Sequence, residues 1–318
     1  MKRCLVAFLV LVMALAFACP VFAAEEEFVI ACVGDSVTEG MQTTGGLKGP
    51  DAFPAVLEGL LKDAGVGNFV VKNFGKSATT AQKAGDVPYK ESMEYRDSLK
   101  SNPDVVLIGL GANDSKVANW DADRYEVDYQ TLIMEYVKLE SKPTVYLVNT
   151  TYVADQAKTG CQRNTIQNKI LPIQKTIAED LELKIIDLNT LTKKNADKYA
   201  DGVHPNDELQ SMMAEYIFNA LCSEGVNGLT ADHASAKVTM LDPAGAKAPA
   251  TDTKADADTG KATDSVISSK PVASSDAPTA TDEAPAPAAG YGWVIWLCAG
   301  VVVAVAAVAV ILLLRKKK

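Results

Sequence analysis

One serine, one histidine and one aspartate in this chain could act together in catalysis. Ser36 ends a Gly-Asp-Ser tripeptide that follows a short apolar run, and His204 lies in an Asp-Gly-Val-His-Pro stretch that begins at Asp201. A serine hydroxyl becomes a good nucleophile when a base takes its proton, and a neutral imidazole is the usual base near pH 7. Asp201 could accept the other ring N–H and so fix the tautomer. These residue types predict nucleophilic attack on an acyl group.

Acyl transfer also needs donors for the negative charge that develops on the carbonyl oxygen. The backbone amides of Ser36 and Gly75 are candidates, because a glycine lets the backbone approach a substrate closely. The side-chain amide of Asn113 could give a third hydrogen bond. The alternatives are that Gly75 is a plain turn glycine and that Asn113 caps a loop.

Short apolar runs alternate with longer segments of helical periodicity, which predicts a parallel sheet covered on both faces. Strands are predicted at 28–33, 69–74, 105–110, 144–149 and 184–187, and helices at 51–64, 90–100, 122–139, 164–181 and 206–222. Pro172 predicts a kink or a late start in the fourth helix. Each chemically interesting stretch follows a strand. Because parallel strands place their carboxyl ends at one edge, we expect these stretches to meet there.

The two ends of the chain predict targeting and anchoring. Residues 1–23 combine a basic start, an apolar core and a small-residue cleavage site, as in a secretory signal peptide. Residues 291–314 form an apolar run long enough to cross a bilayer, and the basic tail 315–318 should stay in the cytoplasm. Residues 227–290 are rich in Ala, Thr, Asp and Pro, which predicts a disordered linker. The folded domain, 25–226, is therefore expected at the cell surface.

Composition excludes several function classes. The net charge of −9 argues against nucleic acid as a partner. No paired Cys or His spacing suggests zinc and no Gly-rich phosphate loop is present, so no cofactor or metal is expected. Cys32 falls in a predicted core strand, and a disulfide between Cys161 and Cys222 is compatible with an oxidising compartment, although no spacing rule requires it. The oligomeric state is not indicated.

Four of these stretches, taken in order, form a recognisable pattern. They resemble the motif blocks of the SGNH or GDSL hydrolase superfamily, which supply Ser, Gly, Asn and His in that chain order. In this sequence the blocks fall on Ser36, Gly75, Asn113, and Asp201 with His204. The resemblance covers about residues 28–221. It implies a flavodoxin-like three-layer α/β/α fold with about five parallel strands, and an esterase or lipase activity without metal.

The substrate is indicated more weakly. The stretches around Tyr89 and from Asn113 to Trp120 look like the carbohydrate-acting branch of that superfamily, which includes sialate and other sugar O-acetylesterases. Tyr89 and Trp120 could offer flat surfaces to a sugar ring, with Asp35 as a further substrate contact; alternatively, Trp120 only packs on the following helix. We therefore expect a serine esterase that removes small acyl groups, above all acetyl, from an acylated glycan or another small ester.

Two alternatives remain open from the sequence. The first is a lipid-directed esterase of the same fold, such as a lysophospholipase or thioesterase. The second is a glycan-binding surface protein that has kept the scaffold and lost turnover.

Overall fold

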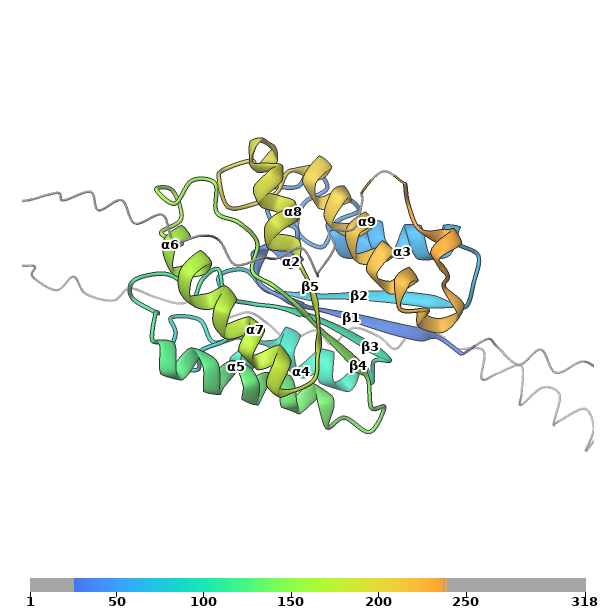
Figure 1. The fold of residues 1–318 in the computed structure, drawn as a ribbon, viewed down its shortest axis with the longest axis horizontal. Helices are drawn as coiled ribbons and strands as arrows, with labels where there is room; N and C mark the ends of the chain where they lie inside the picture. The colour runs from blue at the N-terminus through green and yellow to red at the C-terminus, as the bar shows by residue number, and fades with distance from the viewer. Residues whose placement is uncertain (1–25, 237, 239–318) are drawn as a thin grey trace, which may run out of the picture. The chain divides into compact units, whose positions relative to one another are not determined.

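The computed structural model describes residues 26–236 and residue 238. Five parallel strands form one sheet in the order β2-β1-β3-β4-β5 (Figure 1). The strands are β1 (Phe28–Gly34), β2 (Phe69–Gly75), β3 (Val105–Gly109), β4 (Thr144–Val148) and β5 (Lys184–Ile186). The five-stranded parallel sheet confirms the expected α/β fold, and every strand begins or ends within one residue of its predicted bounds.

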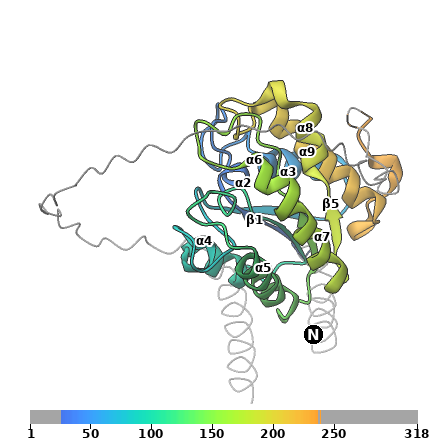
Figure 2. The same cartoon turned by 60° about the vertical axis from the view of Figure 1, so that its left-hand side comes forward.

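Helices cover both faces of the sheet (Figures 1 and 2). One face is covered by α3 (Phe53–Asp63), α8 (Leu188–Lys194) and α9 (Asp207–Ser223). The other face is covered by α4 (Met93–Lys100), α5 (Ala122–Val137) and α7 (Leu171–Asp180). The short helices α2 (Ser36–Glu39) and α6 (Arg163–Thr165) lie in connections.

The central strand β1 shows why its sequence is apolar without interruption. Ile30 and Cys32 pack into the core on the α3 and α9 face, whereas Ala31 and Val33 pack into the core on the α5 face. Successive side chains of a strand point to opposite faces, so a strand covered on both sides needs an apolar residue at every position.

One helix was not predicted, and another starts late at a proline, as predicted. Helix α8 was not predicted; it follows β5 directly, and Asp187 caps it by accepting a hydrogen bond from the Thr190 amide at 3.0 Å. In the fourth predicted helix, residues Ile166–Ile170 form a π-helical turn before α7 begins at Leu171. Because Pro172 has no N–H, regular α-helical bonding cannot run through it from the preceding turn, which confirms the late start expected there.

The packed domain continues beyond residue 226. Leu229 and Val238 are buried in the same core as α9. The Asn219 side chain on α9 donates hydrogen bonds to the carbonyl oxygens of Ser235 at 3.0 Å and Val238 at 2.7 Å. The first residues of the predicted linker therefore pack against the domain.

The predicted signal peptide 1–23, the membrane helix 291–314, the tail 315–318 and most of the linker lie outside the described residues. Among residues 26–236 and 238, no helix is both long and apolar enough to cross a bilayer.

The disulfide considered between Cys161 and Cys222 is not formed. Both thiols are buried and free. Cys161 belongs to the core on the α5 face and Cys222 to the core on the α9 face, so the sheet lies between them.

Candidate active site

The turn after β1 places Ser36 at the carboxyl edge of the sheet. Asp35 caps the short helix α2, because its side chain accepts a hydrogen bond from the Val37 amide at 3.0 Å. A Cβ atom on Gly34 would lie 2.2 Å from the Thr38 hydroxyl oxygen and 2.8 Å from the Gly109 carbonyl oxygen. Only glycine fits at this position, which explains the first residue of the Gly-Asp-Ser motif.

The structure brings the three predicted side chains together. The Ser36 Oγ atom lies 2.9 Å from His204 Nε2, and His204 Nδ1 lies 2.7 Å from Asp201 Oδ2. Ser36 and His204 are both buried. The other carboxylate oxygen, Asp201 Oδ1, accepts hydrogen bonds from the backbone amides of Val203 at 3.0 Å and His204 at 2.8 Å. The carboxylate therefore holds both the ring and the backbone of the histidine.

These contacts set the protonation of the site. Burial alone would raise the pKa of Asp201, but hydrogen bonds from the His204 ring and from the amides of His204 and Val203 outweigh it and lower the pKa below its usual value. An ionised Asp201 keeps the ring proton on Nδ1, which leaves the Nε2 lone pair directed at the Ser36 hydroxyl. This is the arrangement that activates a serine nucleophile.

The loop after β4 holds the histidine loop in place. The backbone amides of Ala154 and Asp155 both donate to the Gly202 carbonyl oxygen, at 2.7 and 3.0 Å. Gly202 has a φ of +90°, a left-handed conformation that favours glycine. The Arg163 guanidinium donates to the Ala154 carbonyl oxygen and so holds this loop against the turn before His204.

A cavity of about 170 Å³ opens beside the serine, and we call it the Ser36 cavity. It is lined by Ser36, Met41, Ser77, Ala78, Ala112, Asn113, Lys116, Thr159, Cys161, Val203 and His204. The loops that follow β1, β2 and β3 and the loop before α9 all contribute to its wall. Among the described residues, no group of three or more His, Cys, Asp or Glu side chains is placed to hold a metal ion.

A model of the GDSL-like lipase/acylhydrolase family matches residues 32–211. The chain belongs to this family. The match extends from within β1 into α9, so it includes all three residues of the Ser36, His204 and Asp201 arrangement.

A curated relative of this GDSL-family chain is named acetylxylan esterase and comes from Xylanibacter ruminicola. It is 34% identical over 215 residues, which are 62% of this chain and 44% of the relative. The chain therefore spans less than half the length of that relative.

Solved structures share the fold. One matches with a TM-score of 0.52 at 19% identity, over 62% of this chain and 97% of the other. The lipase/acylhydrolase from Enterococcus faecalis matches with a TM-score of 0.48 at 21% identity, over 61% of this chain and 94% of that protein. The first of these shows that a solved structure shares the fold of this chain.

The second expected oxyanion donor is not where the sequence placed it. The Gly75 amide donates to the Asn73 side chain at 2.9 Å, and Gly75 does not line the Ser36 cavity. A Cβ atom on Gly75 would lie 2.2 Å from the Glu39 backbone nitrogen, so this glycine allows β2 to approach α2. These contacts contradict the predicted role of Gly75 as a donor.

Ala78, three residues after Gly75, is a candidate for that donor. It lines the Ser36 cavity and has a φ of +67°. Within the part of the chain that the structure describes, the backbone amides of Ser36 and Ala78 have no hydrogen-bond acceptor. Sequence reasoning missed Ala78 because a left-handed residue is normally signalled by glycine, asparagine or aspartate.

Asn113 does line the cavity, as expected. One N–H of its side chain donates to the Thr79 carbonyl oxygen at 3.1 Å, which leaves the second N–H for a ligand. The next residue, Asp114, ties two loops together by accepting hydrogen bonds from the amides of Ala81 at 3.0 Å and Gln82 at 2.9 Å. Burial raises the pKa of Asp114 to about 6, although those amides act in the opposite direction.

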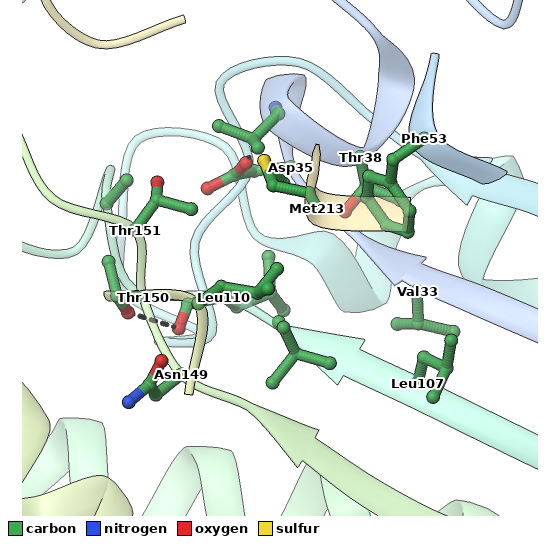
Figure 3. A pocket seen from close by; sticks show the side chains of 15 residues that line it. Val33, Asp35, Thr38, Phe53, Leu107, Leu110, Asn149, Thr150, Thr151 and Met213 are labelled. Carbon is green, nitrogen blue, oxygen red and sulfur yellow. Dashed lines mark hydrogen bonds between the residues drawn. The ribbon is translucent and has the colours of Figure 1, made fainter. Parts of the chain in front are cut away.

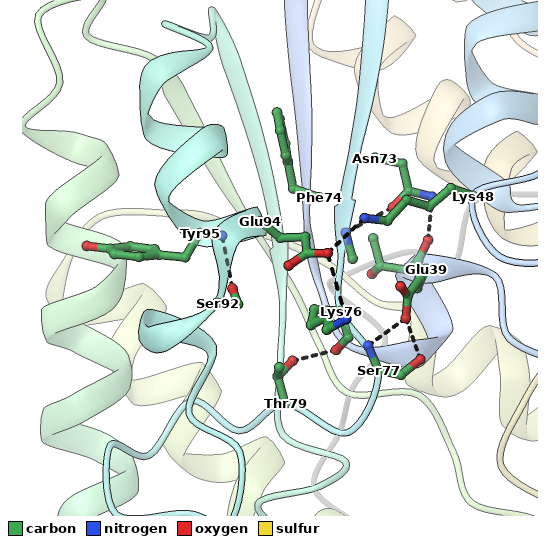
Figure 4. A network of polar contacts seen from close by, with 12 residues as sticks. Glu39, Lys48, Asn73, Phe74, Lys76, Ser77, Thr79, Ser92, Glu94 and Tyr95 are labelled. Atoms are coloured by element: carbon green, nitrogen blue, oxygen red, sulfur yellow. Dashed lines mark hydrogen bonds and ion pairs between the residues drawn. The ribbon is translucent and has the colours of Figure 1, made fainter. Parts of the chain in front are cut away.

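The loop that bears Ala78 is fastened to α2 by a buried carboxylate (Figure 4). Glu39 accepts hydrogen bonds from the Ser77 amide at 2.6 Å and from the Ser77 hydroxyl. On the outer side, Glu94 of α4 pairs with Lys48 at 3.2 Å. Because α2 begins with Ser36, this serine and the Ala78 loop are held in one hydrogen-bonded unit.

The three expected substrate contacts do not line the Ser36 cavity. Tyr89 is fully buried and its hydroxyl donates to the Phe74 carbonyl oxygen at 2.8 Å, so the ring cannot face a sugar. Trp120 is half-buried and packs on Tyr125 of α5 with ring centroids 5.8 Å apart, which agrees with the alternative role of packing on the following helix.

Asp35 faces a different space. It lines a separate cavity of about 30 Å³ beneath the Ser36 turn, between the ends of β1, β3 and β4 (Figure 3). That volume is about the size of one water molecule. Burial raises the pKa of Asp35 to about 6. Its contacts make it the cap of α2 rather than a substrate ligand.

Proposed function

We propose that this GDSL-family protein is a serine esterase that removes acetyl groups from carbohydrate. The observation that carries the proposal is the chain of contacts from Ser36 Oγ to His204 Nε2, at 2.9 Å, and from His204 Nδ1 to Asp201, at 2.7 Å, beside an open cavity. The relative named acetylxylan esterase supports an acetylated glycan as the substrate class. The cavity volume of about 170 Å³ supports a small acyl group over a long chain.

The geometry suggests how each group takes part. The Ser36 oxygen forms a bond to the ester carbonyl carbon while its proton passes to His204 Nε2. The carbonyl oxygen, now negative, accepts hydrogen bonds from the amides of Ser36 and Ala78 and from the Asn113 side chain. Asp201 stabilises the imidazolium that has formed.

Collapse of this intermediate breaks the bond to the sugar oxygen. His204 gives its proton to that leaving alkoxide, and acetyl-Ser36 remains. A water molecule then attacks the acyl carbon while His204 takes its proton. The second collapse releases acetate and returns the proton to the Ser36 oxygen, so the enzyme is restored.

Replacement of the nucleophile tests the proposal. We expect Ser36→Ala to abolish acetate release from acetylated xylooligosaccharides while its thermal unfolding stays close to that of the native protein. Ser211→Ala, at a half-buried serine of α9 outside the cavity, serves as the matched control. Acetate release by Ser36→Ala at the native rate would exclude this mechanism.

Two further measurements separate the alternatives. A fluorophosphonate probe should label native protein at Ser36 and leave Ser36→Ala unlabelled, whereas a glycan-binding protein without turnover would show no labelling. Faster turnover of long-chain than short-chain p-nitrophenyl esters would favour the lipid-directed esterase instead.

We further propose that the domain acts outside the cell on a membrane anchor, as the sequence of residues 1–23 and 291–318 predicts. Fractionation of the producing cells tests this proposal. The full chain should be found with the membrane and be accessible to added protease, and a chain ending at residue 290 should be released into the medium. Full-length chain that is protected from protease in intact cells would contradict it.

A further inference from the structure

The Ser36 cavity is lined by a lysine that the proposed chemistry does not use. Lys116 is the one lysine or arginine among the residues that line it, and no aspartate or glutamate belongs to that lining. The remaining wall is made of neutral side chains, apart from the ring of His204. A ligand in this cavity therefore meets one cation and no lining anion.

The backbone of Lys116 is fixed relative to the oxyanion donors. Its amide donates to the Asn113 carbonyl oxygen at 3.2 Å, and its own carbonyl accepts from the amides of Asn119 at 2.9 Å and Trp120 at 3.0 Å. Asn113 and Lys116 thus belong to one hydrogen-bonded turn. When the ester oxygen of a substrate reaches Asn113, the substrate groups next to that ester lie close to the Cβ end of the Lys116 side chain.

The charge of Lys116 is only loosely balanced. The Asp86 carboxylate lies 4.0 Å from its ammonium nitrogen, at the limit for an ion pair. Asp86 is half-exposed and accepts a hydrogen bond of 2.8 Å from the Asn119 side chain. Two buried carboxylates are also near this part of the site, but Asp114 is bonded to backbone amides and Asp35 caps α2.

The Lys116 side chain is itself 24% exposed, so it is partly withdrawn from water. Attraction between charges is stronger in such a place than on an open surface. A partly desolvated cation in a neutral cavity favours a ligand that brings its own negative charge.

We propose that Lys116 binds a carboxylate of the substrate, so that the preferred ester is an acetylated acidic saccharide. The carboxylate belongs to the acetylated sugar or to the sugar joined to it, as in a glycan that contains uronic acid. This inference rests on the proposed esterase function and specifies the substrate class of the same site.

Two matched esters test the inference. One is O-acetylated glucuronic acid methyl glycoside, and the other is the corresponding O-acetylated glucoside without the carboxylate. The measured quantity is the ratio of kcat/KM for the acidic ester to kcat/KM for the neutral ester. We expect a ratio of about five for the native protein, which is near the upper range for a partly exposed ion pair. Added salt should lower it, because ions screen the attraction.

Two variants make the test specific. Lys116→Gln should bring the ratio to about one, and Lys116→Glu should bring it below one. Lys175→Gln, on the exposed surface of α7, changes the net charge equally and should keep the native ratio.

A native ratio near one would overturn the inference, as would a ratio that Lys116→Gln does not change. If Lys116→Gln lowered kcat/KM equally for both esters, Lys116 would act on the reaction and not on recognition of the carboxylate. The proposed function fails separately, through activity that persists in Ser36→Ala on both esters.

Discussion

Two hydrogen bonds join Glu39, at the end of α2, to Ser77 in the loop after β2. The Glu39 carboxylate, which is only 5% exposed, accepts from both the amide and the hydroxyl of Ser77. Glu39 is the last residue of the helix that begins with Ser36, and Ser77 directly precedes Ala78. The link therefore ties the helix of Ser36, the proposed nucleophile, to the loop of Ala78, a proposed donor for the oxyanion.

Removal of this link should impair turnover more than binding. We expect Glu39→Ala to lower kcat about tenfold or more with little change in KM, because the Ala78 amide is used mainly in the transition state. Glu39→Gln should keep more of the native kcat than Glu39→Ala does, because both Ser77 hydrogen bonds go to one carboxylate oxygen and the amide oxygen of glutamine can take its place. Steady-state kinetics on p-nitrophenyl acetate measure both effects.

An exposed carboxylate provides the control for this positioning role. Glu179→Ala, on the outer face of α7, should keep the native kcat. If Glu39→Ala lowered only the melting temperature and kept the native kcat, Glu39 would be a structural residue alone.

A second prediction concerns the glycine that the sequence placed in the oxyanion hole. Gly75→Ala should destabilise the domain by about 3 kcal/mol, because its methyl group would lie 2.2 Å from the Glu39 backbone nitrogen. Gly59→Ala is the matched change on the exposed side of helix α3, where a new methyl meets no atom within 4 Å. It should stabilise by about 0.5–1 kcal/mol. Denaturant unfolding of both variants tests the pair, and equal effects would contradict the packing argument.

The proximity of Ser36, His204 and Asp201 could be predicted from sequence because their residue types are scarce and their order is informative. The chain has two histidines, and only His204 follows a strand with an aspartate three residues before it. The alternation of apolar runs then predicted that Ser36 and the loops after the next strands share one edge. Both inferences depend on local pattern and on the geometry of parallel sheets.

The positions of Ala78 and Tyr89 could not be obtained in that way. Ala78 has a φ of +67°, and the residue before it, Ser77, is held by Glu39 from 38 residues earlier in the sequence. Tyr89 is buried because its amide bonds to the Thr80 carbonyl oxygen at 2.9 Å, which folds the loop back over the core. Such long-range contacts override the local preference of a residue.

A third prediction concerns stability and pH. Burial raises the pKa of Asp114 to about 6, so between about pH 4 and pH 6 the folded protein holds this proton more tightly than the unfolded chain does. The contribution of Asp114 to the free energy of unfolding therefore falls by about 3 kcal/mol as the pH rises through that window. Asp114→Asn should make the free energy of unfolding fall less steeply with pH, even if the variant is less stable than the native protein at every pH.

Denaturant unfolding at several pH values measures that slope. Asp197→Asn, at a carboxylate that is 79% exposed, should leave the slope as it is in the native protein. An unchanged slope in Asp114→Asn would mean that Asp114 does not hold its proton in the folded state.

The last prediction concerns the carboxylate behind the histidine. Asp201→Asn should lower kcat by about 10³–10⁴-fold, because an amide in this place can donate to Nδ1 and so favour the tautomer that has its proton on Nε2. The native protein should show a downfield proton resonance for the His204 Nδ1–H bonded to Asp201 at 2.7 Å, and the variant should lack it. Because hydrogen bonds from His204 and Val203 lower the pKa of Asp201, that resonance should persist in mildly acidic solution rather than vanish near pH 4. A variant that kept both the resonance and the native kcat would show that Asp201 neither orients nor stabilises the imidazole.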